Sequence, residues 1–274
     1  MPHVNLNIPA FRHEFYAVAV KADGGGKALA GHFRHFPNGA TLFFNSPFQV
    51  ISWDISPNWQ GYYIIFSQEF LAQSRILANV LSHFPFLKID TAIPFEIPSD
   101  DLPAITAIYD AIYEEYHGDA VDKFHLIEAQ IFLLLTMVKR IFDSRVDLSE
   151  AQKQFKTADL KLLSRYQTLI ETSFQPDARH ENLSNIHSTA FYAQKLSVHP
   201  NHLNAVVKSI TGQTALNHIH HHILNLAKAY LAQSEMSAKE IAFLLRFETA
   251  NAFSSFFKRK TGETALEYRK KSLQ

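Results

Sequence analysis

Two groups of short polar side chains, each followed by a lysine, recur near the C-terminus of this 274-residue chain. The groups lie 50 positions apart, so that Asn201 corresponds to Asn251 and Lys208 corresponds to Lys258. Amide, hydroxyl and imidazole groups can hydrogen-bond to base edges in a DNA major groove, and lysine can pair with a phosphate. The pattern therefore predicts a DNA-reading surface. Its candidate contact residues are Asn201, His202, Asn204, Ala205 and Lys208 in the first copy, and Thr249, Asn251, Ser254, Ser255 and Lys258 in the second.

The residues around these groups predict two helix-turn-helix units. In each copy a short first helix begins at a serine that can cap it, Ser188 or Ser237. A second helix, expected at about 200–210 and again at 250–260, carries an apolar stripe at i, i+3, i+4 and i+7 spacing. Both second helices end at a Thr-Gly pair, whose glycine can take the left-handed C-cap conformation. Two copies make a pair of modules and not a solenoid.

A third helix is predicted between the two units, from Thr214 to Gln233. About 20 residues at ~1.5 Å per residue span ~30 Å. Successive major grooves on one face of B-DNA repeat every ~34 Å, so one chain could place two reading helices in adjacent grooves. The alternative is a plain helical bundle whose polar face is solvated, and the alignment of two copies favours the DNA-reading interpretation.

The C-terminal part of the chain resembles the DNA-binding domain of AraC/XylS-type transcriptional regulators. The resemblance implies a seven-helix domain with the two recognition helices given above. It also implies double-stranded DNA as a partner and RNA polymerase as a further partner. The residues that carry it are Tyr192–Leu196, Leu203–Gly212, Ala227–Leu231, Ile241–Phe247, Phe253–Gly262 and Glu267–Arg269.

Three residues depart from the pattern of that family. Arg246 stands where glycine is usual in the turn before Phe247, so a strained or rebuilt turn is expected there. Ala265 replaces the usual proline before the last helix, and His222 stands where arginine is common. These changes could weaken or redirect DNA contacts, but the buried pattern is intact.

The net charge of zero hides an asymmetry between the two halves. Residues 1–155 carry 11 Lys/Arg against 17 Asp/Glu, and residues 156–274 carry 15 against 9. The basic half suits a phosphate partner and the acidic half does not. The chain has no cysteine, which excludes disulfides, thiol catalysis and Cys-based zinc sites. With no leader-like start and no apolar run near the ~20 residues that cross a bilayer, a soluble cytoplasmic protein is expected.

The segment from Glu14 to Phe70 predicts β structure. Strand-like runs are present at Phe15–Val20 and Tyr62–Phe66, and turns are predicted at Asp23–Gly26, Pro37–Gly39 and Ser56–Asn58. The stretch from Gly39 to Pro47, with Trp53 and then Gly61-Tyr62, resembles the cupin-like sensor barrel commonly joined to this type of DNA-binding domain. The expected fold class is α+β. The expected domains are a cupin-like barrel at 1–98, a helical dimerisation segment at 99–145, a linker at 146–157 and the double helix-turn-helix domain at 158–274.

A catalytic barrel would need clustered metal ligands, which this segment lacks. Leu42 occupies the position, three residues after Gly39, at which the cupin motif carries a metal-binding histidine. His32 and His35 would point to opposite faces of a strand. We therefore expect no metal, no cofactor and no catalytic residue, and the barrel is either filled by its own side chains or holds one small effector. The candidate effector-lining residues are His13, Arg34 and Trp53.

Two helices are predicted between about 99 and 145. Ser99 is expected to cap the first helix. The second, Asp122 to Asp143, has a wide apolar face that would either pack on the barrel or form a homodimer interface, and the family resemblance favours the dimer. A charge introduced at Leu134 or Ile141 is expected to favour monomers.

Four histidines in the predicted spacer helix suggest a second metal hypothesis. His218 and His222 are spaced i, i+4, as two ligands on one helix can be, but no carboxylate or cysteine is adjacent. We interpret them as a polar stretch with partial positive charge near DNA.

These patterns together favour a DNA-binding transcriptional regulator controlled by a small-molecule effector. One alternative is a constitutive regulator with a purely structural barrel. The other is a cupin-type metalloenzyme with a helical tail.

Overall fold

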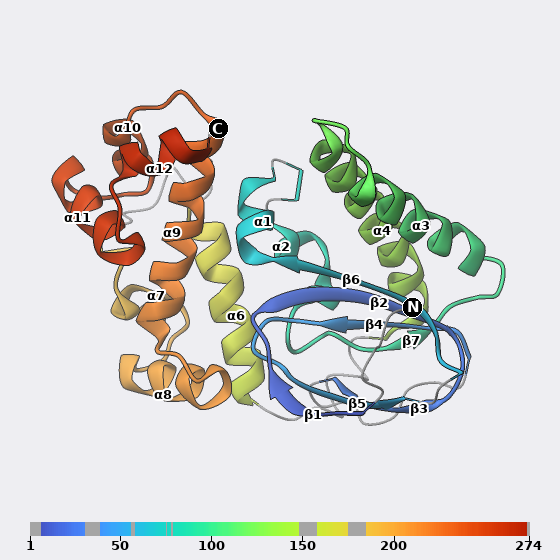
Figure 1. The fold of residues 1–274 in the computed structure, drawn as a ribbon. Helices are drawn as coiled ribbons and strands as arrows, with labels where there is room; N and C mark the ends of the chain where they lie inside the picture. The colour runs from blue at the N-terminus through green and yellow to red at the C-terminus, as the bar shows by residue number, and fades with distance from the viewer. Residues whose placement is uncertain are drawn as a thin grey trace. The chain divides into compact units, whose positions relative to one another are not determined.

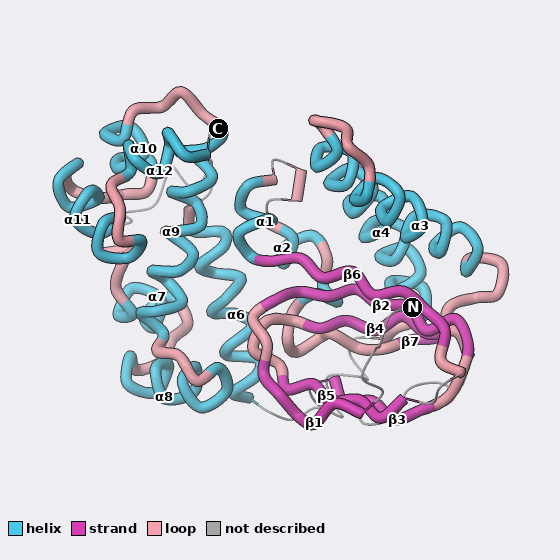
Figure 2. Tube along the Cα trace, viewed as in Figure 1, coloured by secondary structure: helices cyan, strands magenta, loops and turns pink. Residues whose placement is uncertain are grey.

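The computed structural model describes residues 7–30, 39–55, 58–74, 76–77, 79–147, 158–174 and 185–272. The chain divides into two compact units. The first unit comprises Met1–Ser67 and Val80–Ser164, and the second comprises Gln68–Asn79 and Arg165–Gln274. The second unit therefore includes a short segment from the N-terminal half of the sequence. Figure 1 labels the helices and strands, and Figure 2 separates them by type.

The first unit contains two antiparallel sheets, which face one another in Figure 1. The four-stranded sheet has the order β6-β2-β4-β7 and the three-stranded sheet the order β1-β5-β3. Val18 of β2 pairs with Phe44 on one side and Ile64 on the other, and Val18 and Phe44 are fully buried. The strands are β1 (Asn7–Arg12), β2 (Phe15–Asp23), β3 (Gly26–Ala30), β4 (Thr41–Asn45), β5 (Val50–Ile55), β6 (Gln60–Ser67) and β7 (Phe95–Glu96).

Both strand-like runs that the sequence predicts are strands, within β2 and β6. The predicted turn after Asp23 is also present, and Gly24 has a φ of +92° that suits glycine. A side chain at Gly24 would bring its Cβ within 2.4 Å of the Trp59 Cα. Strand β1 was not predicted, because its run of six residues contains Pro9 and does not alternate clearly.

Two long helices follow the sheets in the first unit: α3 (Leu102–His117) and α4 (Lys123–Arg145). The predicted cap at Ser99 is wrong, because Asp101 is the N-cap residue of α3 and makes no side-chain cap bond. Pro103, which can begin a helix without losing a needed N–H donor, explains the start. The Tyr109 hydroxyl on α3 donates to the Val18 carbonyl at 3.0 Å and ties α3 to β2. The short helices α2 (Val80–His83) and η1 (Pro85–Leu87) complete this unit.

The apolar face of α4 packs within the first unit. Phe142 is fully buried, with ring centroids 5.5 Å from Phe86 and 5.7 Å from Phe95. Leu134 and Ile141 are 1% and 9% exposed, so the expectation that a charge there would test a dimer interface is wrong. Such a charge would disrupt the core of the unit. The exposed apolar side chains of α4 are others, namely Phe124, Leu126, Phe132 and Leu133.

In the described C-terminal part of the chain, the regular secondary structure consists of helices joined by turns and short loops. Tyr166 of α6 is fully buried, and its hydroxyl donates to the Ala215 carbonyl at 2.6 Å. The division between the units falls within α6. The helices are α6 (Ala158–Ser173), α7 (Thr189–Lys195), α8 (Pro200–Thr211), α9 (Ala215–Gln233), α10 (Ala238–Leu244), α11 (Ala250–Thr261) and α12 (Ala265–Ser272). The earlier segment of the second unit contributes α1 (Gln68–Gln73).

Several predicted features lie outside the described residues. They are His32, Arg34, His35, the turn residues Pro37, Asn38, Ser56 and Pro57, and all of the linker at 146–157 except Val146 and Asp147. Among the helices that the structure describes, none has both the length and the apolar character that a bilayer crossing requires.

Candidate nucleic-acid interface

The sequence repeat extends to the hydrogen bonds of the two helix-turn-helix units. Ser188 caps α7 by accepting from the Phe191 N–H, and Ser237 caps α10 by accepting from the Glu240 N–H. The Glu240 carboxylate accepts in turn from the Ser237 N–H, which completes a capping box. Both predicted caps are confirmed. Local sequence thus fixes where the first helix of each unit begins.

The turns of the two units have the same backbone shape. Ser197 and Arg246 occupy equivalent positions and have φ angles of 58° and 63°, in the left-handed region. The residue after each donates its N–H back to the alanine in the first helix, from Val198 to Ala193 at 3.0 Å and from Phe247 to Ala242 at 2.9 Å. The turn at Arg246 is therefore strained, as the departure from glycine predicts, and it keeps its shape.

His187 holds the turn around Arg246 on both sides. Its Nε2 donates to the Leu245 carbonyl at 2.8 Å, and its ring meets that of Phe247 edge-on with centroids 4.4 Å apart. Burial lowers the pKa of His187. The neutral ring, protonated at Nε2, suits this contact.

The recognition helices α8 and α11 end in the same way. Gly212 and Gly262 have φ angles of 80° and 85°, as the predicted glycine C-caps require. Each preceding threonine donates its hydroxyl to the carbonyl four residues earlier, Thr211 to Val207 and Thr261 to Phe257. The apolar stripe of each helix is buried, with Leu203, Val206 and Val207 in α8 and Phe253, Phe256 and Phe257 in α11.

Most of the candidate contact residues lie on the exposed faces of these two helices. Lys208 and Lys258 project from the last turn of their helices, where a cation also complements the helix dipole. Thr249 has a structural task as well, because its hydroxyl caps α11 by accepting from the Ala252 N–H at 3.1 Å. The exposed candidates are Asn201, His202, Ala205, Lys208, Thr249, Asn251, Ser254, Ser255 and Lys258.

Asn204 differs from the other candidates. It is only partly exposed, and its Oδ1 accepts from the Ala215 N–H at 3.1 Å. This bond satisfies one of the N–H groups that the start of α9 would otherwise leave unpaired. Ser254, its counterpart in α11, donates instead to the Ala250 carbonyl within its own helix. Asn204 therefore supports the fold of the first helix-turn-helix unit in a way that the sequence did not indicate.

Two exposed cations beside Lys258 were missed among the candidates. Arg259 and Lys260 follow it in the last turn of α11 and are exposed. Their charge was the available signal, and the comparison of the two copies obscured it because α8 has Ser209 and Ile210 at those positions. The end of α11 is the more basic of the two.

Three of the four histidines of α9 do not carry the positive charge that the sequence suggested. Burial lowers the pKa of His218, His220 and His222 to about 4 each, so all three are neutral near pH 7. His218 lies within the fold, with its Nε2 3.0 Å from the Thr211 hydroxyl. Within the described part of the chain, no three His, Cys, Asp or Glu side chains are grouped to hold a metal ion.

Helix α9 separates the two helix-turn-helix units and packs against α7, α8, α10 and α12. It spans 19 residues, about 28 Å at ~1.5 Å per residue. Thr214, where the sequence predicts the helix to begin, is its N-cap residue. At its other end, Arg269 of α12 donates to the carbonyls of Leu231 and Met236 at 3.0 and 2.5 Å. Both ends of the spacer are therefore held by side chains from neighbouring helices.

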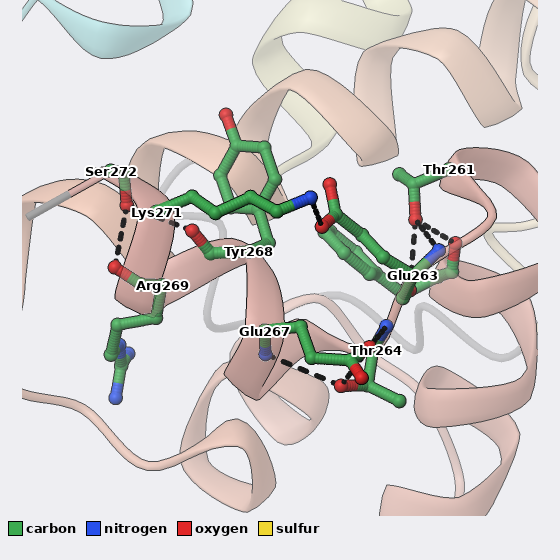
Figure 3. Close-up of polar contacts among 9 residues, drawn as sticks. Thr261, Glu263, Thr264, Glu267, Tyr268, Arg269, Lys271 and Ser272 are labelled. Carbon is green, nitrogen blue, oxygen red and sulfur yellow. Dashed lines mark hydrogen bonds and ion pairs between the residues drawn. The ribbon is translucent and has the colours of Figure 1, made fainter. Parts of the chain in front are cut away.

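Helix α12 is itself anchored at its start, as Figure 3 shows. Thr264 accepts from the Glu267 N–H at 3.2 Å, and the Glu267 carboxylate accepts from the Thr264 N–H at 2.7 Å. This bonding lowers the pKa of Glu267. Lys271, in the last turn of α12, forms an ion pair with Glu263, which precedes the helix. Side-chain hydrogen bonds and an ion pair thus hold the turn that follows the second recognition helix.

In the first unit, the structure connects two of the three candidate effector residues through Phe11. The ring of Phe11 meets His13 with centroids 6.4 Å apart and Trp53 with centroids 5.9 Å apart. His13 is 4% exposed and stacks on Phe15, and burial lowers its pKa to about 4. A neutral imidazole there could hydrogen-bond a ligand but would not pair with a carboxylate by charge.

Comparison with known proteins identifies the C-terminal domain. Residues 192–271, from within α7 to α12, match the family model of a helix-turn-helix domain. Two Bacillus subtilis proteins match over similar lengths. One is an uncharacterized HTH-type transcriptional regulator, YtdP, 30% identical over 77 residues, and the other is the bifunctional transcriptional activator/DNA repair enzyme AdaA, 33% identical over 73 residues. These alignments cover 28% and 27% of this chain, but only 10% and 35% of the relatives.

A solved structure of an AraC-type transcriptional regulator from Chromobacterium violaceum shares 25% identity. The match covers 32% of this chain and 78% of that one, with a TM-score of 0.29. The family match and the residues of the repeat agree on the C-terminal part. Residues 192–271 are an AraC/XylS-type helix-turn-helix domain.

Proposed function

We propose that this chain is a sequence-specific DNA-binding regulator of transcription. The observation that carries the proposal is the pair of helices α8 and α11. Each exposes short polar side chains and a terminal lysine, and a single 19-residue helix separates them. That length suits reading helices in successive major grooves, which repeat every ~34 Å. As a DNA reader, the chain would work in the compartment that holds the chromosome, the bacterial cytoplasm.

The exposed groups divide into base readers and phosphate binders. Asn201 and His202 in α8 offer amide and imidazole groups, and Asn251 in α11 offers one amide. We therefore expect α8 to contribute most of the sequence specificity. Lys258, Arg259 and Lys260 give α11 a basic end suited to phosphates.

In vitro selection from randomised duplex DNA with the full chain tests this function. The expected result is an enriched site with two conserved blocks about one helical turn apart, ~10 bp between their centres. Asn201→Ala should relax the sequence preference in one block only, and Asn251→Ala in the other. Failure to enrich any sequence, together with binding that does not weaken as salt rises, would contradict the proposal.

We propose that the two sheets of the first unit form a cupin-like sensor for a small molecule. Support comes from the aromatic cluster of Phe11, His13 and Trp53, which provides rings and a neutral imidazole near one another. A thermal-shift screen of the full chain against small aromatic and hydroxylated metabolites should find a stabilising compound, and His13→Phe should abolish the shift. If no compound shifts the melting temperature or the DNA affinity, the constitutive alternative is favoured.

We propose that the chain forms a homodimer through the exposed face of α4. Leu126, Ala129, Leu133 and Arg140 are all exposed and follow a 3-, 4- and 7-residue spacing, which places them in one stripe. Leu126 and Leu133 are 48% and 50% exposed and lie in the same stripe, so together they offer an apolar surface that a second copy of the chain could cover. An antiparallel pair centred on Leu133 would set Arg140 beside Leu126 of the partner subunit, whereas a parallel pair would oppose two arginines.

A further inference from the structure

Helix α1 lies in the second unit although its residues come from the N-terminal half of the sequence. It packs against the spacer helix α9. Lys228 donates from Nζ to Glu69 Oε1 at 2.9 Å, and His221 donates from Nδ1 to Gln68 Oε1 at 3.2 Å. Two neighbouring residues of α1 therefore bind two residues of α9 that are seven apart, which puts both contacts on one face of α9.

Two residues of α9 near these contacts are buried. Asn225 lies between His221 and Lys228 at i+4 spacing, and Ala229 follows Lys228. Asn225 is 3% exposed and Ala229 is 5% exposed. Helix α1 is one of the helices that pack against α9. The domain match at residues 192–271 does not include this element.

Lys228 also contacts the second helix-turn-helix unit. Its Nζ lies 5.8 Å from the centre of the Tyr268 ring on α12. Tyr268 in turn meets Phe257 edge-on, with centroids 5.7 Å apart. Phe257 is fully buried on the inner side of the recognition helix α11. A short series of contacts thus runs from Glu69 through Lys228 and Tyr268 to the core of α11.

We propose that helix α1 contributes to DNA reading, because the ion pair between Glu69 of α1 and Lys228 of α9 positions the second recognition helix, α11. Lys228 and Glu69 side chains are 21% and 40% exposed, so the pair is partly shielded from solvent and salt. Strand β6 ends at Ser67 and α1 begins at Gln68, with no loop residue between them. This inference rests on the proposed DNA-reading function.

The charge of the two residues makes a sharp test available. Glu69→Gln removes a negative charge and Lys228→Gln removes a positive one. If the pair acted on DNA only through its net field, the first change would strengthen binding and the second would weaken it. If the pair positions α11, both changes should impair the same part of DNA recognition. The probe is the duplex selected with the full chain, compared with duplexes scrambled in one block at a time.

We expect both variants to lose roughly 2- to 5-fold in discrimination at the α11 block, the range of one partly exposed ion pair. Discrimination at the α8 block should stay unchanged. The double variant should lose no more than either single one, because the two residues act as one pair. Glu235 is an exposed carboxylate two residues beyond the end of α9. Glu235→Gln removes the same charge as Glu69→Gln, so it is the matched control and should leave discrimination at both blocks unaffected. No loss, or equal losses at the two blocks, would overturn the inference.

Hydrogen exchange of the DNA-free full chain separates this inference from the proposed function. Both variants should speed exchange in α11 and α12 and leave α7 and α8 unchanged. That result would uphold the positioning role even if selection enriched no site. Unchanged exchange in α11 and α12 would overturn it, whatever the chain binds.

Discussion

The side-chain oxygen of Asn204 on α8 accepts a hydrogen bond from the backbone N–H of Ala215, the first residue of the spacer helix, at 3.1 Å. The carbonyl of Ala215 accepts from the Tyr166 hydroxyl at 2.6 Å. Both polar groups of Ala215 are therefore held by side chains from α8 and α6. The first recognition helix and the spacer are joined at this point.

Asn204→Ala should lower the free energy of unfolding by about 1 kcal/mol, because it leaves the Ala215 N–H without its acceptor. Asn204→Asp keeps an acceptor oxygen and should restore most of the loss. Asn201→Ala, at an exposed position of the same helix, should stay within ~0.5 kcal/mol of the parent. Urea unfolding of the three variants checks this. Equal stability of the Asn204→Ala and Asn201→Ala proteins would show that the bond to Ala215 contributes nothing.

Arg246→Gly should stabilise the protein. Arg246 has a φ of 63°, a conformation that costs a non-glycine residue about 1 kcal/mol and glycine almost nothing. Part of that gain is offset by the larger backbone entropy of glycine in the unfolded chain. We expect a net increase of about 0.5 kcal/mol in the free energy of unfolding, measured by urea titration. A decrease would mean that the Arg246 side chain makes a compensating contact.

The sequence predicted the C-terminal domain well because its determinants are local. The caps at Ser188 and Ser237 and the glycines at the ends of the recognition helices act within a few residues, and all are found in the structure. The buried stripes follow from helical spacing alone. The role of Asn204 could not be predicted in this way, since its partner lies 11 positions further on, beyond the helix to which it belongs.

Contacts distant in sequence were not predictable. Glu69 binds Lys228 across 159 positions, and neither residue belongs to a pattern that indicates a partner. On α4, the apolar spacing could not distinguish the core face from the outer one, because Leu133 and Leu134 are adjacent and only one of them is buried. The neutral histidines of α9 likewise depend on burial that arises only when neighbouring helices cover them.

His218 should make the second unit sensitive to acid. Burial lowers its pKa to about 4 in the folded protein, against ~6.5 when unfolded. Well above pH 6.5 the His218 ring is neutral in both the folded and the unfolded chain, so it does not lower the free energy of unfolding. As the pH falls from 6.5 to 4, His218 becomes protonated in the unfolded chain but stays neutral in the folded protein. The free energy of unfolding therefore decreases by up to ~1.4 kcal/mol per pH unit for this group.

Comparison of variants isolates this effect from the titrating carboxylates. His218→Gln can keep a hydrogen bond to Thr211 but cannot titrate, so urea unfolding between pH 7 and pH 5 should show a shallower loss of stability. The exposed His202→Gln serves as the control and should follow the parent curve. Parallel curves for the parent and the His218→Gln protein would show that His218 is protonated equally in both states.

Lys258→Ala should weaken binding to all DNA sequences by a similar factor. The lysine lies in the exposed last turn of α11, beside Arg259 and Lys260, and is suited to a phosphate contact. Loss of one phosphate contact should reduce the slope of log affinity against log salt concentration by about 1. Fluorescence anisotropy at several salt concentrations gives the slope. A loss confined to one base sequence would instead make Lys258 a base reader.

Leu133→Glu should convert the proposed dimer to a monomer without unfolding it. Leu133 is 50% exposed on the outer face of α4, so a carboxylate there is solvated in the monomer and would have to be desolvated at an interface. Leu134→Glu, one position further on, places the same charge in the core, where the parent leucine is 1% exposed, and should unfold the first unit. The adjacent pair therefore separates association from folding.

Sedimentation velocity at micromolar concentration, with circular dichroism as the check on folding, should show a parent dimer and a folded Leu133→Glu monomer. A parent chain that sediments as a monomer with and without DNA would reject the interface and leave the outer stripe of α4 unexplained.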